Sequence, residues 1–137
     1  EKNMFFLQVE QSFDSAHFLE KYEGKCRNIH GHRWKVVIEV KGDKLNDQGF
    51  IMDFGEIKMH LKELVSLYDH ALLIERRSMD KEKLEWLKQE HHVIELDFIP
   101  TAENLAQYFY QKLKEKIINI NSVTVFETPN NLVKYTE

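Results

Sequence analysis

The sequence predicts a single α+β domain over residues 1–137. Three observations carry this prediction. Two strand-like runs, at residues 4–16 and 34–41, are arranged as a hairpin with a long connection. Helical patterns with a buried apolar stripe follow, and a second pair of strand-like runs ends the chain. The length suits one hydrophobic core, and no linker, repeat or low-complexity segment divides the chain.

The first half of the chain is the hairpin and one helix. Residues 4–16 have β-forming composition, and the run at residues 34–41 is rich in valine and aromatic residues. Turn-forming residues fill 42–49. Asp53, with Glu56 three residues later, forms a capping-box-like start, and apolar residues at helical spacing predict a helix over residues 54–68.

The second half adds two more helices and shorter strands. The strongly charged stretch 76–90 predicts an exposed helix, and residues 93–98 predict a short strand. Pro100 just before Thr101 predicts the start of a helix whose apolar stripe runs from Leu105 to Ile117. The last predicted strands, at residues 123–127 and 132–135, form a second hairpin.

Composition excludes several classes of protein. The net charge of −4 and sequence pI near 6.0 give no sign of a nucleic-acid partner. No apolar run approaches the length of a membrane span, and the start, Glu1 to Asn3, lacks a signal-peptide pattern. A single cysteine cannot form an internal disulfide, which fits a reducing compartment. We therefore expect a cytoplasmic protein with no membrane partner.

Three histidines form a candidate metal site. His30 and His32 lie two residues apart at the start of a predicted strand, so both rings point to one face. His17, at the end of the earlier strand, is the best candidate for a third ligand. A lone histidine is more often a surface or core residue, but three of them near Cys26, the only cysteine, favour a metal. Structural zinc normally has four protein ligands, whereas three histidines leave an open, catalytic position.

Two further features are candidates for chemistry. Asp69 and His70 follow the first helix; an acid beside a histidine is common by chance, but next to a metal site the pair becomes a candidate proton relay. Glu127 ends an apolar strand. Such a carboxylate is usually a solvated strand end, yet it is also suited to accept paired N–H donors from a guanidine-like edge of a heterocycle.

These motifs occur in an order that resembles one family. They are Phe13-Asp14-Ser15-Ala16-His17, Cys26-x3-His30-Gly31-His32, Gly49-x3-Asp53-Phe54, Asp69-His70, Pro100-Thr101-Ala102-Glu103-Asn104, and Glu127-Thr128 with Tyr135 eight residues after the glutamate. The sequence resembles the 6-pyruvoyl-tetrahydropterin synthase / 6-carboxytetrahydropterin synthase family over nearly the full chain. Each motif alone is weak evidence for the family, but six motifs in the right order are specific evidence for it.

The resemblance implies a tunnelling fold (T-fold), an antiparallel β-sheet with two helices packed on one face. Such sheets associate into a trimeric barrel, and two trimers stack as a homohexamer. The resemblance also implies roles for the site residues. His17, His30 and His32 would be ligands of one Zn²⁺ per subunit, Cys26 the proton acceptor, and Asp69 with His70 the proton relay. Glu127 would anchor the pterin, assisted by Thr101 and Glu103.

The resemblance further implies a substrate, 7,8-dihydroneopterin triphosphate. One branch of the family releases acetaldehyde and triphosphate to give 6-carboxy-5,6,7,8-tetrahydropterin, on the path to queuosine. Another eliminates triphosphate to give 6-pyruvoyl-tetrahydropterin. The three-residue gap between Cys26 and His30 favours the carboxy product, because the pyruvoyl branch typically has a longer gap. A zinc- and pterin-binding module without catalysis, or a metal-free Cys-His hydrolase, are the alternatives.

Overall fold

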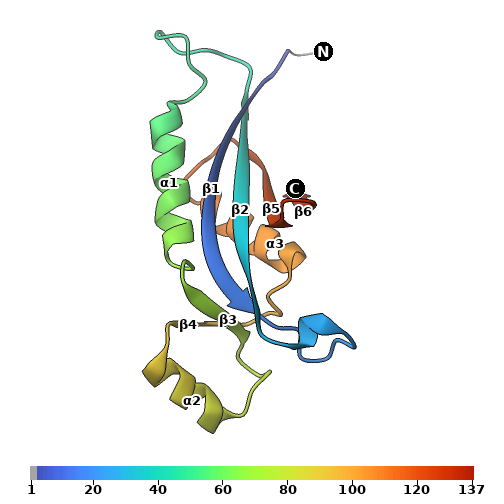
Figure 1. Cartoon of the computed structure of the whole chain (residues 1–137). Helices are drawn as coiled ribbons and strands as arrows, with labels where there is room; N and C mark the ends of the chain where they lie inside the picture. Colours follow the sequence, from blue (N-terminus) through green and yellow to red (C-terminus); the bar gives the residue numbers. More distant parts are fainter. Residues whose placement is uncertain (1–2) are drawn as a thin grey trace.

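A computed structural model describes residues 3–137; Glu1 and Lys2, part of the start examined for a signal peptide, lie outside the described residues. The described chain contains strands, three α-helices and one short 3₁₀ turn (Figure 1). In chain order they are β1 (Phe5–His17), η1 (Lys25–Arg27), β2 (His30–Gly42), α1 (Phe54–Ser66), β3 (Ala71–Glu75), α2 (Lys81–Glu90), β4 (Val93–Leu96), α3 (Ala102–Leu113), β5 (Ile120–Thr128) and β6 (Asn131–Thr136).

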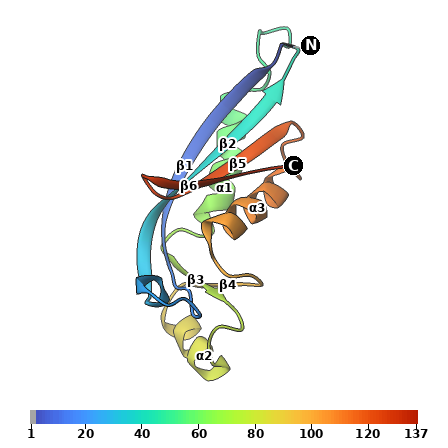
Figure 2. The same ribbon diagram turned by 90° about the vertical axis from the view of Figure 1, so that its right-hand side faces the viewer.

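A long, curved pair of antiparallel strands, β1 and β2, forms the centre of the fold (Figure 2). The pairing is continuous from Phe5 opposite Gly42 to His17 opposite His30. Residues directly opposite each other in such a ladder point to the same face. The buried Phe13 therefore faces the same side as its partner Trp34, and the two rings stack with centroids 6.2 Å apart. The same alternation carries the histidines at the end of the ladder to this side.

The sheet has the strand order β4-β3-β1-β2-β5-β6. The four strands β1, β2, β5 and β6 pair antiparallel, whereas β3 pairs parallel with β1 and with β4. The predicted α+β class is confirmed, but the sheet is mixed and not wholly antiparallel as expected. The strands β3 and β4 are parallel because the chain crosses between them through α2, and a helical crossover returns the next strand in the same direction. The strand β3 follows β2 through α1 but runs opposite to it, and so lies parallel to β1.

Two helices cover one face of the sheet, as predicted. Alternate residues of β1 and β2 are buried together with the apolar stripes of α1 and α3 in one core cluster. Phe13 of β1 contacts Phe109 of α3 edge-on, with ring centroids 6.1 Å apart. Burial of these stripes is the main favourable contribution to stability, at roughly 25 cal/mol per Å² of apolar surface. Among the described residues, no helix packs on the opposite face of β1 and β2, which is more polar.

The third helix, α2, lies beyond the end of the β1–β2 ladder, next to β3 and β4 (Figure 1). It begins at Lys81, where Asp80 accepts a hydrogen bond from the backbone N–H of Glu82 at 3.0 Å. The predicted start at Arg76 was therefore wrong by five residues. The strand Ala71–Glu75 was not predicted, because its apolar run is too short to be distinguished from a helix end.

The helix N-caps at Asp53 and Thr101 are confirmed. Asp53 accepts from the backbone N–H of Gly55 at 2.7 Å, and Thr101 accepts from that of Asn104 at 3.1 Å. Ile117 is buried as predicted, although α3 ends before it, at Leu113. None of the helices in residues 3–137 combines the length and apolar character needed to cross a membrane.

Candidate metal centre and active site

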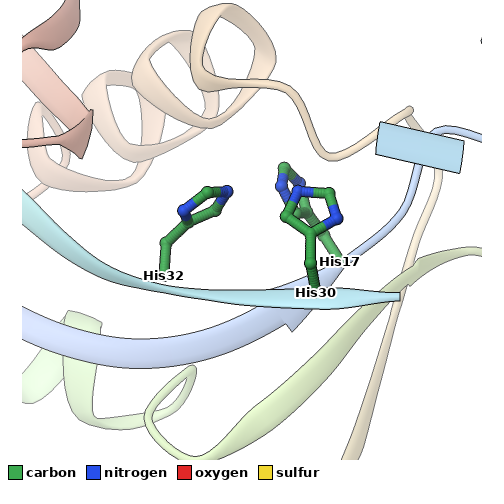
Figure 3. Close-up of side chains that lie close together, drawn as sticks. All are labelled: His17, His30 and His32. Carbon is green, nitrogen blue, oxygen red and sulfur yellow. The ribbon is translucent and has the colours of Figure 1, made fainter. Parts of the chain in front are cut away.

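The rings of His17, His30 and His32 converge at the end of the β1–β2 ladder (Figure 3). His17 is the last residue of β1 and stands opposite His30, the first residue of β2; Ser15 stands opposite His32. Ring centroids lie 4.6 Å apart for His17 and His30, 5.2 Å for His17 and His32, and 4.8 Å for His30 and His32. The predicted convergence of these three distant histidines is therefore found.

Hydrogen bonds fix the tautomer of two of the rings. Nδ1 of His17 lies 2.7 Å from the carbonyl oxygen of Pro100, and Nδ1 of His30 lies 2.7 Å from that of Asn28. A carbonyl oxygen can only accept, so each Nδ1 carries the hydrogen and donates it. In the neutral form of such a ring, Nε2 then holds a free lone pair. A histidine that binds a metal through one ring nitrogen usually donates the N–H of the other nitrogen to such an acceptor.

The site has the unsatisfied atoms that a metal would satisfy. Within residues 3–137, the buried side-chain nitrogen and oxygen atoms without a hydrogen-bond partner are His17 Nε2, His32 Nε2 and Ser15 Oγ. All three lie on one face at one end of the ladder. A buried polar atom without a partner is costly, at roughly 1–3 kcal/mol. Three nitrogen donors whose ligand atoms all lie within 4.8 Å of one another could therefore hold a metal ion.

Burial also keeps the donors in the form that binds metal. Desolvation lowers the pKa of His17 below its ordinary value, and the neighbouring rings of His30 and His32 add to that effect. Desolvation likewise lowers the pKa of His32, with a smaller opposing effect of Glu127. Both rings are therefore neutral at pH 7, and a neutral imidazole is the ligand form.

Trp34 forms the wall of the site towards the core. Its ring lies edge-on to His17 at a centroid distance of 5.0 Å and to His32 at 5.4 Å. The indole is fully buried, and its N–H donates to the carbonyl oxygen of Ser15 at 3.2 Å. Trp34 therefore limits the rotation of two rings without offering them a competing acceptor. Sequence reasoning assigned Trp34 only to the strand.

Glu127 reaches the same site from β5. Its Oε2 lies 3.8 Å from His17 Nε2, and the carboxylate lines a pocket of about 380 Å³ together with His32. Glu127 does not belong to the group of donors whose ligand atoms all lie within 4.8 Å of one another. The arrangement is thus three histidines beside a pocket, with a carboxylate at its wall. A metal ion held by this group would have three protein ligands among the described residues.

Cys26 lies in η1, the short turn between the two long strands. Its thiol is free and half-buried, and its carbonyl oxygen accepts from the backbone N–H of Leu19 at 2.7 Å, which closes the loop that follows β1. Two residues, Asn28 and Ile29, separate the turn from His30. Cys26 does not belong to the group of donors formed by the three histidines, and its role as proton acceptor stays a prediction.

Asp69 and His70 form a hydrogen-bonded pair, but away from the three histidines. His70 Nδ1 lies 2.9 Å from Asp69 Oδ2, and Asp69 Oδ1 accepts from the backbone N–H of Asp14 at 2.9 Å. Asp14 is three residues before His17, roughly 10 Å along the strand, and its side chain points to the other face of the sheet. The relay pair and the histidine triad of one chain are therefore two separate groups.

The geometry of His70 is unusual. Its φ of 55° is in the left-handed region, and its backbone N–H donates to the carbonyl oxygen of Asp14 at 2.6 Å. The hydrogen bond from its ring and the charge of Asp69 raise the pKa of His70, while the hydrogen bond from Asp14 N–H is the main cause that lowers the pKa of Asp69. A histidine held in this way by a carboxylate is suited to exchange protons near neutral pH.

The two assisting residues of the predicted pterin site lie at the start of α3. Thr101 uses its hydroxyl to cap the helix, and Glu103 is exposed in the first turn. Their contact with a substrate stays a prediction. Sequence reasoning missed three residues that contact the candidate site residues: Pro100, Asn28 and Asp14. Pro100 and Asn28 act through backbone carbonyl groups, which leave no signal in residue type or spacing. Asp14 acts through its backbone, and its carboxylate also lies within 4.8 Å of the polar side-chain atoms of Asp69 and His70.

Comparison with known proteins identifies the family. The sequence model of 6-pyruvoyl tetrahydropterin synthase matches residues 6–137. The chain belongs to this family. A 6-carboxy-5,6,7,8-tetrahydropterin synthase of Haemophilus influenzae is 30% identical over 98% of this chain and 100% of its own length. The enzyme of the same name from Synechocystis sp. is 31% identical over 96% of this chain and 93% of its own.

Solved structures agree with this family. The 6-pyruvoyl tetrahydropterin synthase of Caenorhabditis elegans has a TM-score of 0.73 and 26% identity, covering 99% of this chain and 97% of its own. The tunnelling fold that the resemblance implied is therefore confirmed for the single chain. The family is one of tetrahydropterin synthases, which are lyases.

Proposed function

We propose that this protein is a zinc-dependent lyase that converts 7,8-dihydroneopterin triphosphate and one water into 6-carboxy-5,6,7,8-tetrahydropterin, acetaldehyde and triphosphate. The observation that carries the proposal is the group of converging imidazoles His17, His30 and His32, in which the buried Nε2 atoms of His17 and His32 have no hydrogen-bond partner. Relatives named 6-carboxy-5,6,7,8-tetrahydropterin synthase at about 30% identity over nearly the whole chain support the choice of reaction.

The three histidines would hold one Zn²⁺ and leave a position open towards the pocket beside Glu127. When bound, zinc acts as a Lewis acid that makes the side-chain hydroxyls of the substrate, and the adjacent C–H, more acidic. A base of moderate strength is then sufficient, and we assign this role to the thiolate of Cys26. The carboxylate of Glu127 accepts paired N–H donors from the guanidine-like edge of the pterin and so orients the side chain towards the metal.

Asp69 and His70 complete the proposed machinery as a proton relay. Nδ1 of His70 is held by Asp69, so Nε2 is the atom that exchanges protons with the substrate. The pair lies near Asp14, whose side chain is on the face opposite His17, so the relay of one subunit would serve the zinc and cysteine of a neighbour. We therefore propose a homohexamer built as a dimer of trimers, with active sites between subunits.

The choice of product depends on the chain near Cys26. Only three residues separate Cys26 from His30, which favours the carboxy product over 6-pyruvoyl-tetrahydropterin. We place the reaction on the route to queuosine, in the cytoplasm, where a single free thiol is stable. The pyruvoyl product is the alternative outcome of the same active site.

The test is identification of the product by mass spectrometry after incubation of the zinc-loaded protein with 7,8-dihydroneopterin triphosphate. We expect 6-carboxy-5,6,7,8-tetrahydropterin and one acetaldehyde for each triphosphate released. Triphosphate release with a pyruvoyl product would reassign the reaction within the family. Binding without turnover would leave a zinc and pterin-binding module, and full activity of metal-free protein would refute the role of zinc.

A further inference from the structure

We infer that the segment Pro100–Asn104, at the start of α3, positions His17 for metal binding, and that Asn104 is a positioning residue of the metal site. The inference rests on the proposed function, since it assigns a residue to support one of the proposed zinc ligands. Asn104 itself contacts neither the metal position nor the pocket beside Glu127. It acts through the backbone carbonyl of Pro100.

The first step is the contact between Pro100 and His17. The carbonyl oxygen of Pro100 lies 2.7 Å from His17 Nδ1, and both residues are buried although they are 83 positions apart in the chain. His30 has an equivalent bond, but its partner Asn28 is only two residues away and the bond is exposed. The orientation of the His17 ring therefore depends on how a distant part of the fold holds one carbonyl group.

The second step is how that carbonyl is held. The side-chain amide of Asn104 donates to the carbonyl oxygen of Ile99 at 2.9 Å, and the backbone N–H of Thr101 donates to the same oxygen at 2.8 Å. In return, the hydroxyl of Thr101 accepts from the backbone N–H of Asn104 at 3.1 Å. The φ angle of Pro100 is fixed by its ring. These bonds tie the peptide units on both sides of Pro100 to the first turn of α3.

The third step is the rigidity of α3 itself. Leu105, Ala106 and Phe109 of the helix are fully buried against the sheet that carries His17. The helix start therefore cannot shift relative to the end of β1 without disturbing the core. A carbonyl group held in this way selects the tautomer of His17 with Nδ1 protonated and aims Nε2 at the metal position. Loss of such an outer partner typically weakens metal binding about 10- to 100-fold.

The test is zinc affinity of the Asn104→Asp variant. Aspartate has the same shape, but its ionised carboxylate cannot donate to Ile99, so the bond is lost. A carboxylate in the first turn of a helix is favourable, so α3 is expected to remain folded. We expect competition titration of metal-free protein against a chromogenic zinc chelator to give a Kd raised about 10-fold or more. Asn104→Ala, which also removes the donor, should weaken binding in the same direction.

A second measurement reports the tautomer directly. In metal-free protein labelled with ¹⁵N-histidine, we expect the His17 ring of the wild type to be protonated at Nδ1 alone. In Asn104→Asp we expect the ¹⁵N shifts to move towards a mixture of both tautomers. A role of Asn104 in helix stability alone would lower the Tm without moving these shifts or the zinc affinity.

The matched control is Asp80→Ala, which removes the N-cap of α2, a helix away from the triad. It should lower the Tm but leave the zinc affinity unchanged. Wild-type affinity and wild-type ¹⁵N shifts in both Asn104 variants would overturn the inference and leave the proposed function intact. The inference would also be overturned if Asp80→Ala weakened zinc binding as much as the Asn104 variants do. If the wild-type protein itself bound no zinc, the proposed metal site and this inference would both be rejected.

Discussion

The carboxylate of Glu127 lies 3.8 Å from Nε2 of His17, the nitrogen that is free to bind a metal. The two residues come from β5 and β1, which are separated in the sheet by β2. Burial keeps His17 neutral, so their approach is not an ion pair. The relationship instead puts a carboxylate beside a nitrogen donor of the candidate metal site. Under the proposed function, one small molecule would contact both.

Glu127→Gln tests the pterin anchor. The amide keeps the shape but replaces one acceptor oxygen by a donor and removes the charge, so paired N–H donors of the pterin lose a charge-assisted partner. We expect the affinity for an unreactive pterin to fall about 10- to 100-fold, from the roughly 1.5–3 kcal/mol of such a bond. Isothermal titration measures this affinity, and zinc content by elemental analysis should stay at one per chain. Unaltered pterin affinity would contradict the anchor.

Cys26→Ala tests the proton acceptor. The thiol belongs to a short turn and is not one of the three converging donors, so its removal should leave both fold and zinc content unchanged. Loss of a general base typically lowers the rate by about 10²- to 10⁴-fold. Acetaldehyde release under saturating substrate measures kcat. Turnover at the wild-type rate would mean that another group takes the proton.

His30→Ala tests the metal site. Removal of one of three nitrogen donors leaves two, which is too few to retain zinc, so we expect loss of both zinc and activity. Zinc content after dialysis against a weak chelator is the measurement. The control is His92→Ala, which removes an exposed histidine just beyond α2 and should retain zinc. Zinc retained by the His30 variant would show that the ion is held elsewhere.

The sequence was sufficient for the parts of the fold that have strong periodicity. The run at residues 4–16 was predicted as a strand with His17 at its end, and the apolar stripe of α3 predicted its buried side; both are found. The strand Ala71–Glu75 and its parallel pairing were missed. The run has five residues, and its burial depends on β4, which is distant in sequence and pairs with it only in the folded chain.

The site could be predicted from side chains but not from backbone contacts. His17 was identifiable because it stands at the end of the first predicted strand, and the structure places it opposite His30. That His17 donates to the carbonyl oxygen of Pro100 could not be predicted, since any residue has a carbonyl group. The separation of Asp69 from the three histidines could not be predicted either. Asp69 is held by a hydrogen bond from the backbone N–H of Asp14, and any residue except proline has such a donor.

His70→Asn tests the relay without backbone strain. The residue has a φ of 55°, a conformation that asparagine tolerates better than most residues, so we expect an unchanged Tm. The amide cannot exchange a proton near neutral pH, and kcat should fall about 10²-fold or more. His70→Val, with a branched side chain that does not tolerate this φ, should lower the Tm as well. Full activity of the asparagine variant would exclude His70 from proton transfer.

The stability of the metal-free protein should fall in mild acid. Burial lowers the pKa of His17 and His32 in the folded chain, so the unfolded chain, with ordinary values near 6.5, binds protons first. Their contribution is therefore fully present above pH 6.5 and is lost as the pH falls towards the folded values. Asp69 and Glu39 also have a lowered pKa, but starting from 3.8 and 4.5 their effect belongs to stronger acid.

Urea unfolding of metal-free protein at pH 7.0, 6.0 and 5.0 measures this dependence. The free energy of unfolding should decrease over the series, and His17→Gln, although less stable at pH 7.0, should show a smaller decrease because one buried titrating ring is gone. His70 acts in the opposite direction, since Asp69 raises its pKa, so its contribution is present below pH 6.5 and is lost as the pH rises. His70→Asn should therefore steepen the loss of stability towards acid. A flat profile between pH 7.0 and 5.0 in His70→Asn, where the opposing contribution of His70 is absent, would mean that the buried rings are not held neutral by the fold.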